Sequence, residues 1–253
     1  MNFIKWTETR TIAKTIISIY VFSFLIACQE SPQKENVPIH KKVLPGHEDI
    51  DLHKIKLYSS KYFKPFGEMT YDLNKVKFDD KQLLQLNIGF EVRGSQSPDT
   101  VFFDLKTLAF VKRSFKNSFS KYTGKLMFKN NKLTGALEPY TDDSDLKESL
   151  QFDKQFSHGL FEPAMLSYLL GSLPLQIGYS ASLPMLDLNN GGSIVWANIE
   201  VVEKKKIKVK GEWYDTWKII SDGSRNKIFW IDVADNKLVK MKNEGVWFQW
   251  KLE

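Results

Sequence analysis

From about residue 54 onward, the sequence is a succession of short runs in which apolar and polar residues alternate, separated by turn-forming residues. Alternation places every second side chain on the same face of a β-strand, so each run can bury one face and expose the other. Many such runs at short spacing are typical of antiparallel sandwiches and barrels. The sequence therefore predicts a single mainly β domain over residues 54–253.

Three hairpins are clearly marked in the first half of this domain. Each consists of two alternating runs around a short polar loop, as tight turns require. The predicted strand pairs are 67–78 with 83–94, 99–104 with 108–115, and 122–129 with 132–140. We expect a single antiparallel sheet of about ten to twelve strands, either strongly curved or closed into a barrel.

Residues 162–172 (EPAMLSYLLGS) carry the one strong helical pattern. Pro163 suits the first turn of a helix, where its missing N–H costs no hydrogen bond. The apolar stripe that follows consists of Met165, Leu166, Leu169 and Leu170. Because such a stripe must be buried against something, we expect this short helix to cover or plug the curved sheet.

The N-terminus predicts export and lipidation. Basic residues precede residues 15–27, which carry no charge and would span only about 20 Å as a helix, less than a bilayer core. This is typical of a secretory signal peptide, and residues 25–28 (LIAC) resemble a bacterial lipobox. We expect removal of residues 1–27, acylation of Cys28 and a flexible tether over residues 28–53. A signal anchor with an incidental cysteine is the alternative.

The expected location is the bacterial cell envelope. Acyl chains would hold the protein on a membrane stably, because each buried CH₂ contributes about 0.8 kcal/mol. The residue after Cys28 is Gln29 rather than the aspartate that resembles an inner-membrane retention signal. We therefore expect the protein on the outer membrane, with the periplasmic face and the cell-surface face as alternatives.

One long stretch, 156–188 (FSHGLFEPAMLSYLLGSLPLQIGYSASLPMLDL), carries a family resemblance together with FFDLKTLAFVKR (102–113) and KIFWIDVADNKLVKM (227–241). These segments resemble a family of uncharacterised, exported, β-rich bacterial proteins. That family in turn is similar to the lipoprotein carriers LolA and LolB, whose curved sheets or barrels hold a helix against an apolar interior. The resemblance covers about residues 65–253 and implies a fold but no catalytic residue.

A curved sheet lined with aromatic residues favours a non-enzymatic domain that binds an apolar small molecule or a lipid. The same side chains would fill the core of a protein that acts instead through its surface, as an interaction partner in an envelope complex. An exposed Trp247 would favour this alternative. The candidate cavity-lining residues are Met165, Leu166, Leu169, Leu170, Trp217, Trp230, Phe248 and Trp250.

The densest basic cluster comprises Lys204, Lys205, Lys206 and Lys208. These lysines are candidates for contact with anionic lipid headgroups, although lysines on a strand also prevent edge-to-edge aggregation without any ligand. The net charge of +6 and the pI of about 9.1 do not indicate nucleic acid, because no nucleic-acid-binding motif accompanies the lysines in an exported chain.

The sequence contains no recognisable catalytic or cofactor-binding motif. His47, Asp49, Asp51 and His53 alternate, but side chains on one extended strand diverge too far to surround a single ion. An acidic loop over residues 142–148 lacks the spacing of a calcium loop, and His158 is expected to be a loop or capping residue. We therefore expect no metal, no cofactor and no enzymatic activity.

Overall fold

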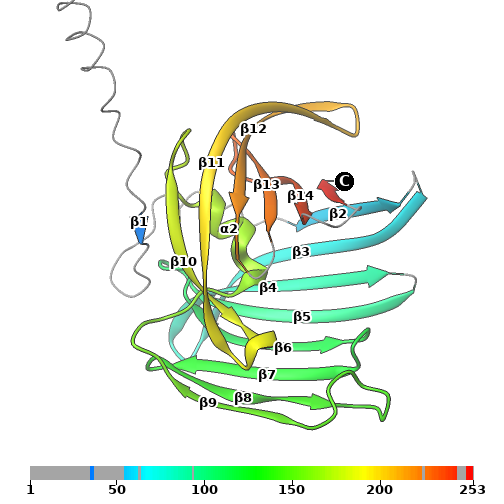
Figure 1. Ribbon diagram of the computed structural model, residues 1–253, viewed down its shortest axis with the longest axis vertical. Helices are drawn as coiled ribbons and strands as arrows, with labels where there is room; N and C mark the ends of the chain where they lie inside the picture. The colour runs from blue at the N-terminus through cyan, green and yellow to red at the C-terminus, as the bar shows by residue number, and fades with distance from the viewer. Residues whose placement is uncertain are drawn as a thin grey trace, which may run out of the picture. The chain divides into compact units, whose positions relative to one another are not determined.

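The computed structural model describes residues 35–36, 54–61, 64–92, 94–223, 226–243 and 249–252 (Figure 1). The predicted signal peptide, Cys28 and nearly all of the predicted tether lie outside these residues. So do the histidines and aspartates of residues 47–53, as well as Trp247 and Phe248. In the described part of the chain, no helix is both long and apolar enough to cross a membrane.

The fold is mainly β, with one short α-helix among the described residues. The first strands are β1 (Glu35–Asn36), β2 (Lys54–Lys61), β3 (Lys64–Phe78), β4 (Lys81–Val92), β5 (Ser95–Asp104), β6 (Phe110–Asn117), β7 (Tyr122–Lys129), β8 (Lys132–Pro139) and β9 (Leu150–Gln155). The 3₁₀ turn η1 (Pro163–Met165) and the helix α2 (Leu166–Gly171) follow. The remaining elements are β10 (Ser180–Asp187), η2 (Leu188–Asn190), β11 (Ser193–Val209), β12 (Glu212–Ser221), β13 (Lys227–Asp232), β14 (Leu238–Asn243) and β15 (Gln249–Leu252).

All fifteen strands are hydrogen-bonded in one order, β1-β10-β11-β12-β13-β14-β15-β2-β3-β4-β5-β6-β7-β8-β9. Every neighbouring pair is antiparallel except β1 with β10. Two antiparallel halves, β10–β15 and β2–β9, are joined where β15 pairs with β2. In Figure 1 the strands of the two halves run at a steep angle to each other.

The three predicted hairpins are confirmed, as β3–β4, β5–β6 and β7–β8. Asp79 and Asp80 form the turn of the first, and Asn130 and Asn131 form the turn of the third. All four have positive φ angles between 46° and 61°. Short polar side chains tolerate this left-handed conformation, which matches the twist of a two-residue hairpin.

Neither half of the sheet is closed, so the predicted alternative of a closed barrel is wrong. The chain between β9 and β10 contacts one strand of each half. There the N–H of Phe110 donates to the carbonyl oxygen of Leu160 at 2.8 Å, and Phe161 forms a parallel bridge with Met185. The expected ten to twelve strands were also too few, because short strands such as β9 and β15 complete the sheet.

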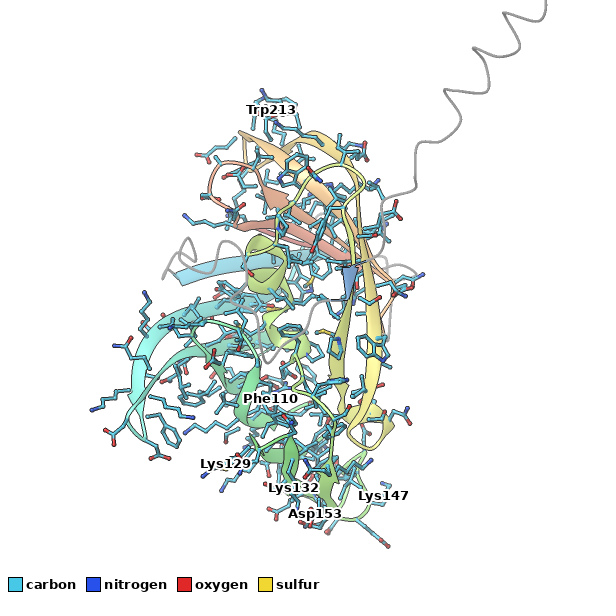
Figure 2. All side chains as sticks on the ribbon, turned by 90° about the vertical axis from the view of Figure 1, so that its left-hand side faces the viewer. Phe110, Lys129, Lys132, Lys147, Asp153 and Trp213 are labelled. Carbon is cyan, nitrogen blue, oxygen red and sulfur yellow. The ribbon has the colours of Figure 1, made fainter. Side chains whose placement is uncertain are left out.

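The predicted helix is confirmed as η1 followed by α2. Pro163 occupies the first turn, and the Glu162 side chain accepts a hydrogen bond from the N–H of Ala164, as an N-cap does. Both figures place α2 between the two halves of the sheet (Figures 1 and 2). All six residues of α2 are buried, so the helix is enclosed on every side rather than along one stripe.

Close packing fixes the helix within the domain. A Cβ added to Gly171 would lie 2.3 Å from the carbonyl oxygen of Asn236, so only glycine permits this approach to the β13–β14 turn. The hydrophobic core surrounds the helix, and its largest fully buried side chains include Phe103, Phe110, Phe161 and Phe229. The two halves of the sheet thus share one core.

Candidate functional site

A pocket with a volume of about 520 Å³ lies between the two halves of the sheet, beside the helix. Strands β3 to β7 supply one side, and β10, η2, β13 and β14 supply the other. Pro163, Ala164, Leu166 and Ser167 of η1 and α2 complete the lining. The helix therefore shapes a pocket as well as filling the core.

About half of the pocket wall is apolar. Inward-facing side chains of β3, β4 and β6 meet side chains of β10, β13 and β14 across it. The apolar lining includes Met69, Ile88, Phe90, Phe115, Leu166, Leu186, Phe229 and Met241. Phe90 also packs edge-on against Trp250, with ring centroids 5.6 Å apart. A small molecule with an apolar body can therefore make contacts on both sides of the pocket.

Three charged residues that line this pocket form a compact cluster. Asp99 lies on β5, Arg113 lies on β6, and Glu162 immediately precedes η1. The Arg113 Nε donates to Asp99 Oδ1 at 3.0 Å and its Nη2 donates to Asp99 Oδ2 at 2.6 Å. Its Nη1 donates to Glu162 Oε1 at 2.5 Å. Arg113 thus bridges two carboxylates from separate parts of the chain.

The charged cluster is largely removed from solvent. Only 1% of the Glu162 side chain is exposed, against 14% for Asp99 and 18% for Arg113. The second carboxylate oxygen of Glu162 accepts the N–H of Ala164 at 2.6 Å. Each buried charge therefore has a charged partner or a hydrogen bond, without which its desolvation would be very costly.

Burial and the neighbouring charges shift the pKa values at this cluster. Burial raises the pKa of Glu162, and the Arg113 guanidinium opposes that rise. Burial by itself would lower the pKa of Arg113, but the carboxylates of Glu162 and Asp99 more than compensate and raise it. Burial also raises the pKa of the nearby Tyr71 hydroxyl, and the same two carboxylates raise it further. Arg113 and Tyr71 therefore keep their protons at all ordinary pH values.

A glycine shapes the wall next to the cluster. The Arg113 guanidinium carbon lies 4.4 Å from the centre of the Phe115 ring, a cation–π distance. A Cβ added to Gly124 on the neighbouring strand would lie 2.3 Å from Cε1 of this ring. Gly124 thus leaves the space that the Phe115 ring occupies between Arg113 and the neighbouring strand.

The structure places the predicted helix residues in two settings. Leu166 lines the pocket, whereas Met165, Leu169 and Leu170 do not line it. Those three are 1%, 0% and 0% exposed and belong to the hydrophobic core. The enclosed position of the helix is the reason, because most of its apolar side chains face neighbouring core residues.

Three of the predicted aromatic residues, Trp217, Trp230 and Trp250, also lie outside the pocket lining, and Phe248 lies outside the described residues. Trp250 is buried in the core behind Phe90, and Trp217 is half-buried against the core. Trp230 is buried on the face of β13 opposite Phe229, with the Lys240 Nζ 4.4 Å from its ring centre. The predicted lysine cluster lies on β11, and Lys204, Lys205, Lys206 and Lys208 are all exposed.

The sequence analysis did not identify Asp99, Arg113 or Glu162. A signal for Asp99 exists, because it shares one face of β5 with Val101 and Phe103, which are both 0% exposed. Glu162 likewise stands inside the apolar stretch GLFEPAML. A charged residue on an apolar face needs a buried partner, but sequence spacing does not reveal which residue that is.

The remaining candidate residues form no metal site in the part of the chain that the structure describes, where no group of three potential ligands converges. In the acidic loop, Asp143 pairs with Lys121 instead. His158 lies in a loop, as expected, with its Nδ1 2.9 Å from the carbonyl oxygen of Gly159 and its ring against Trp196.

Similarity to known proteins exists in both sequence and fold. No curated protein matches the sequence. One solved structure, described as a beta-barrel-like protein of domain of unknown function DUF1849 from Brucella abortus, has a TM-score of 0.47 and 12% sequence identity. The match covers 79% of this chain and 94% of that chain. Residues 55–245 match the family described as "Protein of unknown function (DUF3108)". This agrees with the resemblance to a β-rich family, and because the match spans most of the sequence, the chain belongs to the DUF3108 family.

Proposed function

We propose that this protein is a non-enzymatic binding domain for a lipid or another small apolar molecule, which occupies the pocket between the halves of the sheet. We further propose that acyl chains on Cys28 hold it at the bacterial envelope, on the outer membrane. We also propose that the fold is similar to that of the lipoprotein carriers LolA and LolB. The observation that carries it is the pocket of about 520 Å³, into which apolar side chains project from both sides.

The volume of the pocket falls within the range of about 300–1,000 Å³ that is typical of small-molecule sites. Such sites combine apolar walls with polar groups that orient the ligand. Here about half of the wall is apolar, from strands far apart in the sheet order, and the polar half includes the cluster of Asp99, Arg113 and Glu162. The cluster is already paired internally, which supports a role in orienting a ligand rather than in proton transfer.

The charges of the lining favour a ligand with an uncharged polar end. Acidic and basic side chains are equally numerous around the pocket. They are Asp99, Glu162 and Asp187 on the acidic side, and Arg113, Lys116 and Lys227 on the basic side. A hydroxyl or ester can exchange hydrogen bonds with such a lining, whereas a net charge would have to be desolvated without a net opposite charge.

The alternative of a surface-acting interaction protein receives less support. It requires a continuous apolar patch on the exterior. The exposed large apolar residues of the described chain are spread over several loops and strands instead. They are Phe119, Met127, Tyr140, Ile177, Trp196 and Trp213. Trp247, which the sequence analysis named as the discriminating residue, lies outside the described residues.

Displacement of a bound fluorescent acyl probe tests the pocket. We expect 1-decanol to displace the probe more effectively than decanoate at pH 8, because both have a ten-carbon chain but the polar end is neutral in the alcohol and charged in the carboxylate. Ile88→Trp, which fills the pocket, should weaken probe binding about tenfold or more, equivalent to about 1.4 kcal/mol. Ile177→Trp introduces the same side chain at a position that is 65% exposed and outside the pocket, and serves as the matched control.

The outcomes separate the proposal from its alternatives. Equal loss of binding in both tryptophan variants, or no binding of any acyl probe by the folded protein, would overturn the pocket assignment. Stronger binding of decanoate than of decanol would refute the uncharged polar end while leaving the pocket in place. Mass spectrometry of an organic extract of protein purified from its host identifies the natural ligand.

The anchor is tested separately in cells. We expect the wild-type chain to partition into the detergent phase and to incorporate a labelled fatty acid. A Cys28→Ser variant should remain in the aqueous phase and incorporate no label. Membrane association that persists unchanged in the Cys28→Ser variant would contradict anchoring through this residue.

A further inference from the structure

The β11–β12 hairpin extends beyond the strands that flank it. β10 pairs with β11 only as far as Glu200, and β13 pairs with β12 only from Thr216 onward. Residues 203–215 therefore form a two-stranded ribbon whose outer edges pair with no described strand. Figure 1 shows this ribbon as an arc, and Figure 2 places Trp213 at the opposite end of the sheet domain from Lys129 and Lys132.

The pairing register divides the side chains of this ribbon, and of the β11–β12 pairs at its base, between two faces. Residues directly opposite each other on antiparallel strands share a face. The pairs of one face are Lys204 with Trp217, Lys206 with Asp215, and Lys208 with Trp213. We call these six residues the basic–aromatic face. It carries three lysines and two tryptophans against a single acid.

The lysines of this face are available for an outside partner. Lys204, Lys206 and Lys208 are exposed, and within the described residues none of them forms an ion pair. Two of them lie near aromatic rings, with the Lys204 Nζ 5.7 Å from the Trp217 ring centre and the Lys208 Nζ 5.6 Å from that of Trp213.

The other face of the ribbon differs in this respect. There Glu203 accepts a hydrogen bond from the Lys218 Nζ at 2.8 Å and lies 3.9 Å from the Lys205 Nζ. The positive charges of that face are therefore balanced within the protein. Lys205, which the sequence pattern grouped with the other lysines, is separated from them by the register of the hairpin.

Trp213 is the second distinctive feature of the basic–aromatic face. It is 60% exposed, whereas Trp230 and Trp250 are 7% and 5% exposed. Lysines alone would serve to keep an unpaired strand edge from aggregating. An indole exposed among them serves no such purpose, because it adds apolar surface at the place to be protected.

We propose that the basic–aromatic face binds the surface of a membrane that contains anionic lipids. Lysines near such a surface are attracted to the phosphate groups, and tryptophan is enriched at the level of the lipid headgroups, where its ring is partly apolar and its N–H is hydrated. The single acid of the face leaves its positive charge in excess. This contact is independent of the pocket and of acylation at Cys28.

Flotation with lipid vesicles tests the proposal. The full chain carrying Cys28→Ser is mixed with vesicles of phosphatidylcholine, with or without phosphatidylglycerol, at low and high salt. We expect binding that requires phosphatidylglycerol and weakens with salt. Each lysine near an anionic surface contributes about 1 kcal/mol of binding free energy. We therefore expect each lysine to raise the partition coefficient about fivefold. Lys204→Glu/Lys206→Glu/Lys208→Glu should therefore reduce binding by more than about a hundredfold.

The matched control changes the net charge equally elsewhere. Lys81, Lys125 and Lys129 are exposed on β4 and β7, and their triple replacement by glutamate should leave most of the binding intact. Glutamates also protect strand edges, so solubility should be preserved in both triple variants. Circular dichroism and urea titration establish that both remain folded.

Quenching by brominated lipid tests the indole directly. We expect Trp213→Phe to lose most of the bromine quenching seen in the parent protein on anionic vesicles. Trp196→Phe is the control, because Trp196 is also exposed but packs against the ring of His158 on another part of β11. Equal quenching in the parent and in both variants would exclude insertion of Trp213.

Several results would overturn the proposal. Equal loss in the two triple variants would show that binding depends on net charge and not on this face. Unchanged binding in the Lys204/Lys206/Lys208 variant would leave edge protection as the role of these lysines. Binding to a soluble polyanion such as heparin, without binding to anionic vesicles, would point to a different class of partner.

Discussion

The buried cluster beside the pocket makes a specific prediction about stability. Arg113→Met removes the guanidinium between Asp99 and Glu162 but keeps an unbranched side chain that can pack on Phe115. Because the Glu162 side chain is only 1% exposed, its carboxylate is left buried without its charged partner. Breaking a buried ion pair from one side costs about 3–5 kcal/mol, a large part of the roughly 5–15 kcal/mol by which a typical domain is stable.

The loss should depend on pH in a defined direction. Burial raises the pKa of Glu162 above its ordinary value of 4.5, and Arg113 opposes this rise. Without Arg113 we expect the pKa of Glu162 in the folded state to rise further. A carboxyl whose folded pKa exceeds its unfolded pKa stabilises the fold at low pH and loses that contribution as pH rises. The free energy of unfolding of the variant should therefore increase as the pH falls from about 8 to about 5. This increase should be steeper than that of the wild type.

Urea titrations followed by circular dichroism at both pH values measure these differences. Glu162→Gln added to Arg113→Met removes the more deeply buried of the two unpaired charges while keeping an oxygen that can accept the N–H of Ala164. The double variant should be more stable than Arg113→Met alone at pH 8, although it carries one change more. Two results would refute this account of the cluster. One is a loss of less than about 1 kcal/mol in the free energy of unfolding of Arg113→Met. The other is a double variant that is less stable than Arg113→Met at pH 8.

Three further predictions concern packing and turns. Gly124→Ala should destabilise the protein by about 1–3 kcal/mol and weaken decanol binding, because the new methyl group displaces the Phe115 ring; unchanged urea midpoint and affinity would contradict this. Asn131, with a φ of 59°, should tolerate glycine, whereas Asn131→Ala should cost about 1–2 kcal/mol in a urea titration. Leu169→Ala should cost about 2–5 kcal/mol in the same measurement, and Ile177→Ala, at an exposed position, less than about 0.5 kcal/mol. Similar costs at these two positions would argue against the enclosed helix.

The local parts of the fold could be predicted from the sequence because their signals are local. Alternation marks the strands, and Asp79–Asp80 and Asn130–Asn131 mark turns by the conformations that these residues tolerate. Pro163 likewise marks the start of the helix. Whether the sheet closes was not predictable in this way, since it depends on pairing between distant segments. The contacts of residues 160–161 with β6 and β10 are of the same kind. Such contacts leave no periodic pattern in the sequence.

The candidate site illustrates the same limit. Of the four helix residues predicted to line a cavity, Leu166 lies in the pocket wall, whereas Met165, Leu169 and Leu170 have the same apolar character and lie in the core away from the pocket. Hydrophobicity indicates burial and does not distinguish a filled interior from the wall of a pocket. Asp99 and Arg113 meet Glu162 only because β5, β6 and the segment before the helix converge, which no spacing in the sequence specifies.

The pairing of β15 with β2 has a consequence for how the protein folds. Trp250 pairs with Ser59, so strands from the two ends of the described sheet domain meet in the interior of the strand order. Until residues 249–252 are available, β14 and β2 have no strand to connect them. During synthesis, each half can form hairpins, but the complete sheet must wait for residues 249–252. Such long-range pairing slows folding, so we expect docking of β15 to be a late kinetic step.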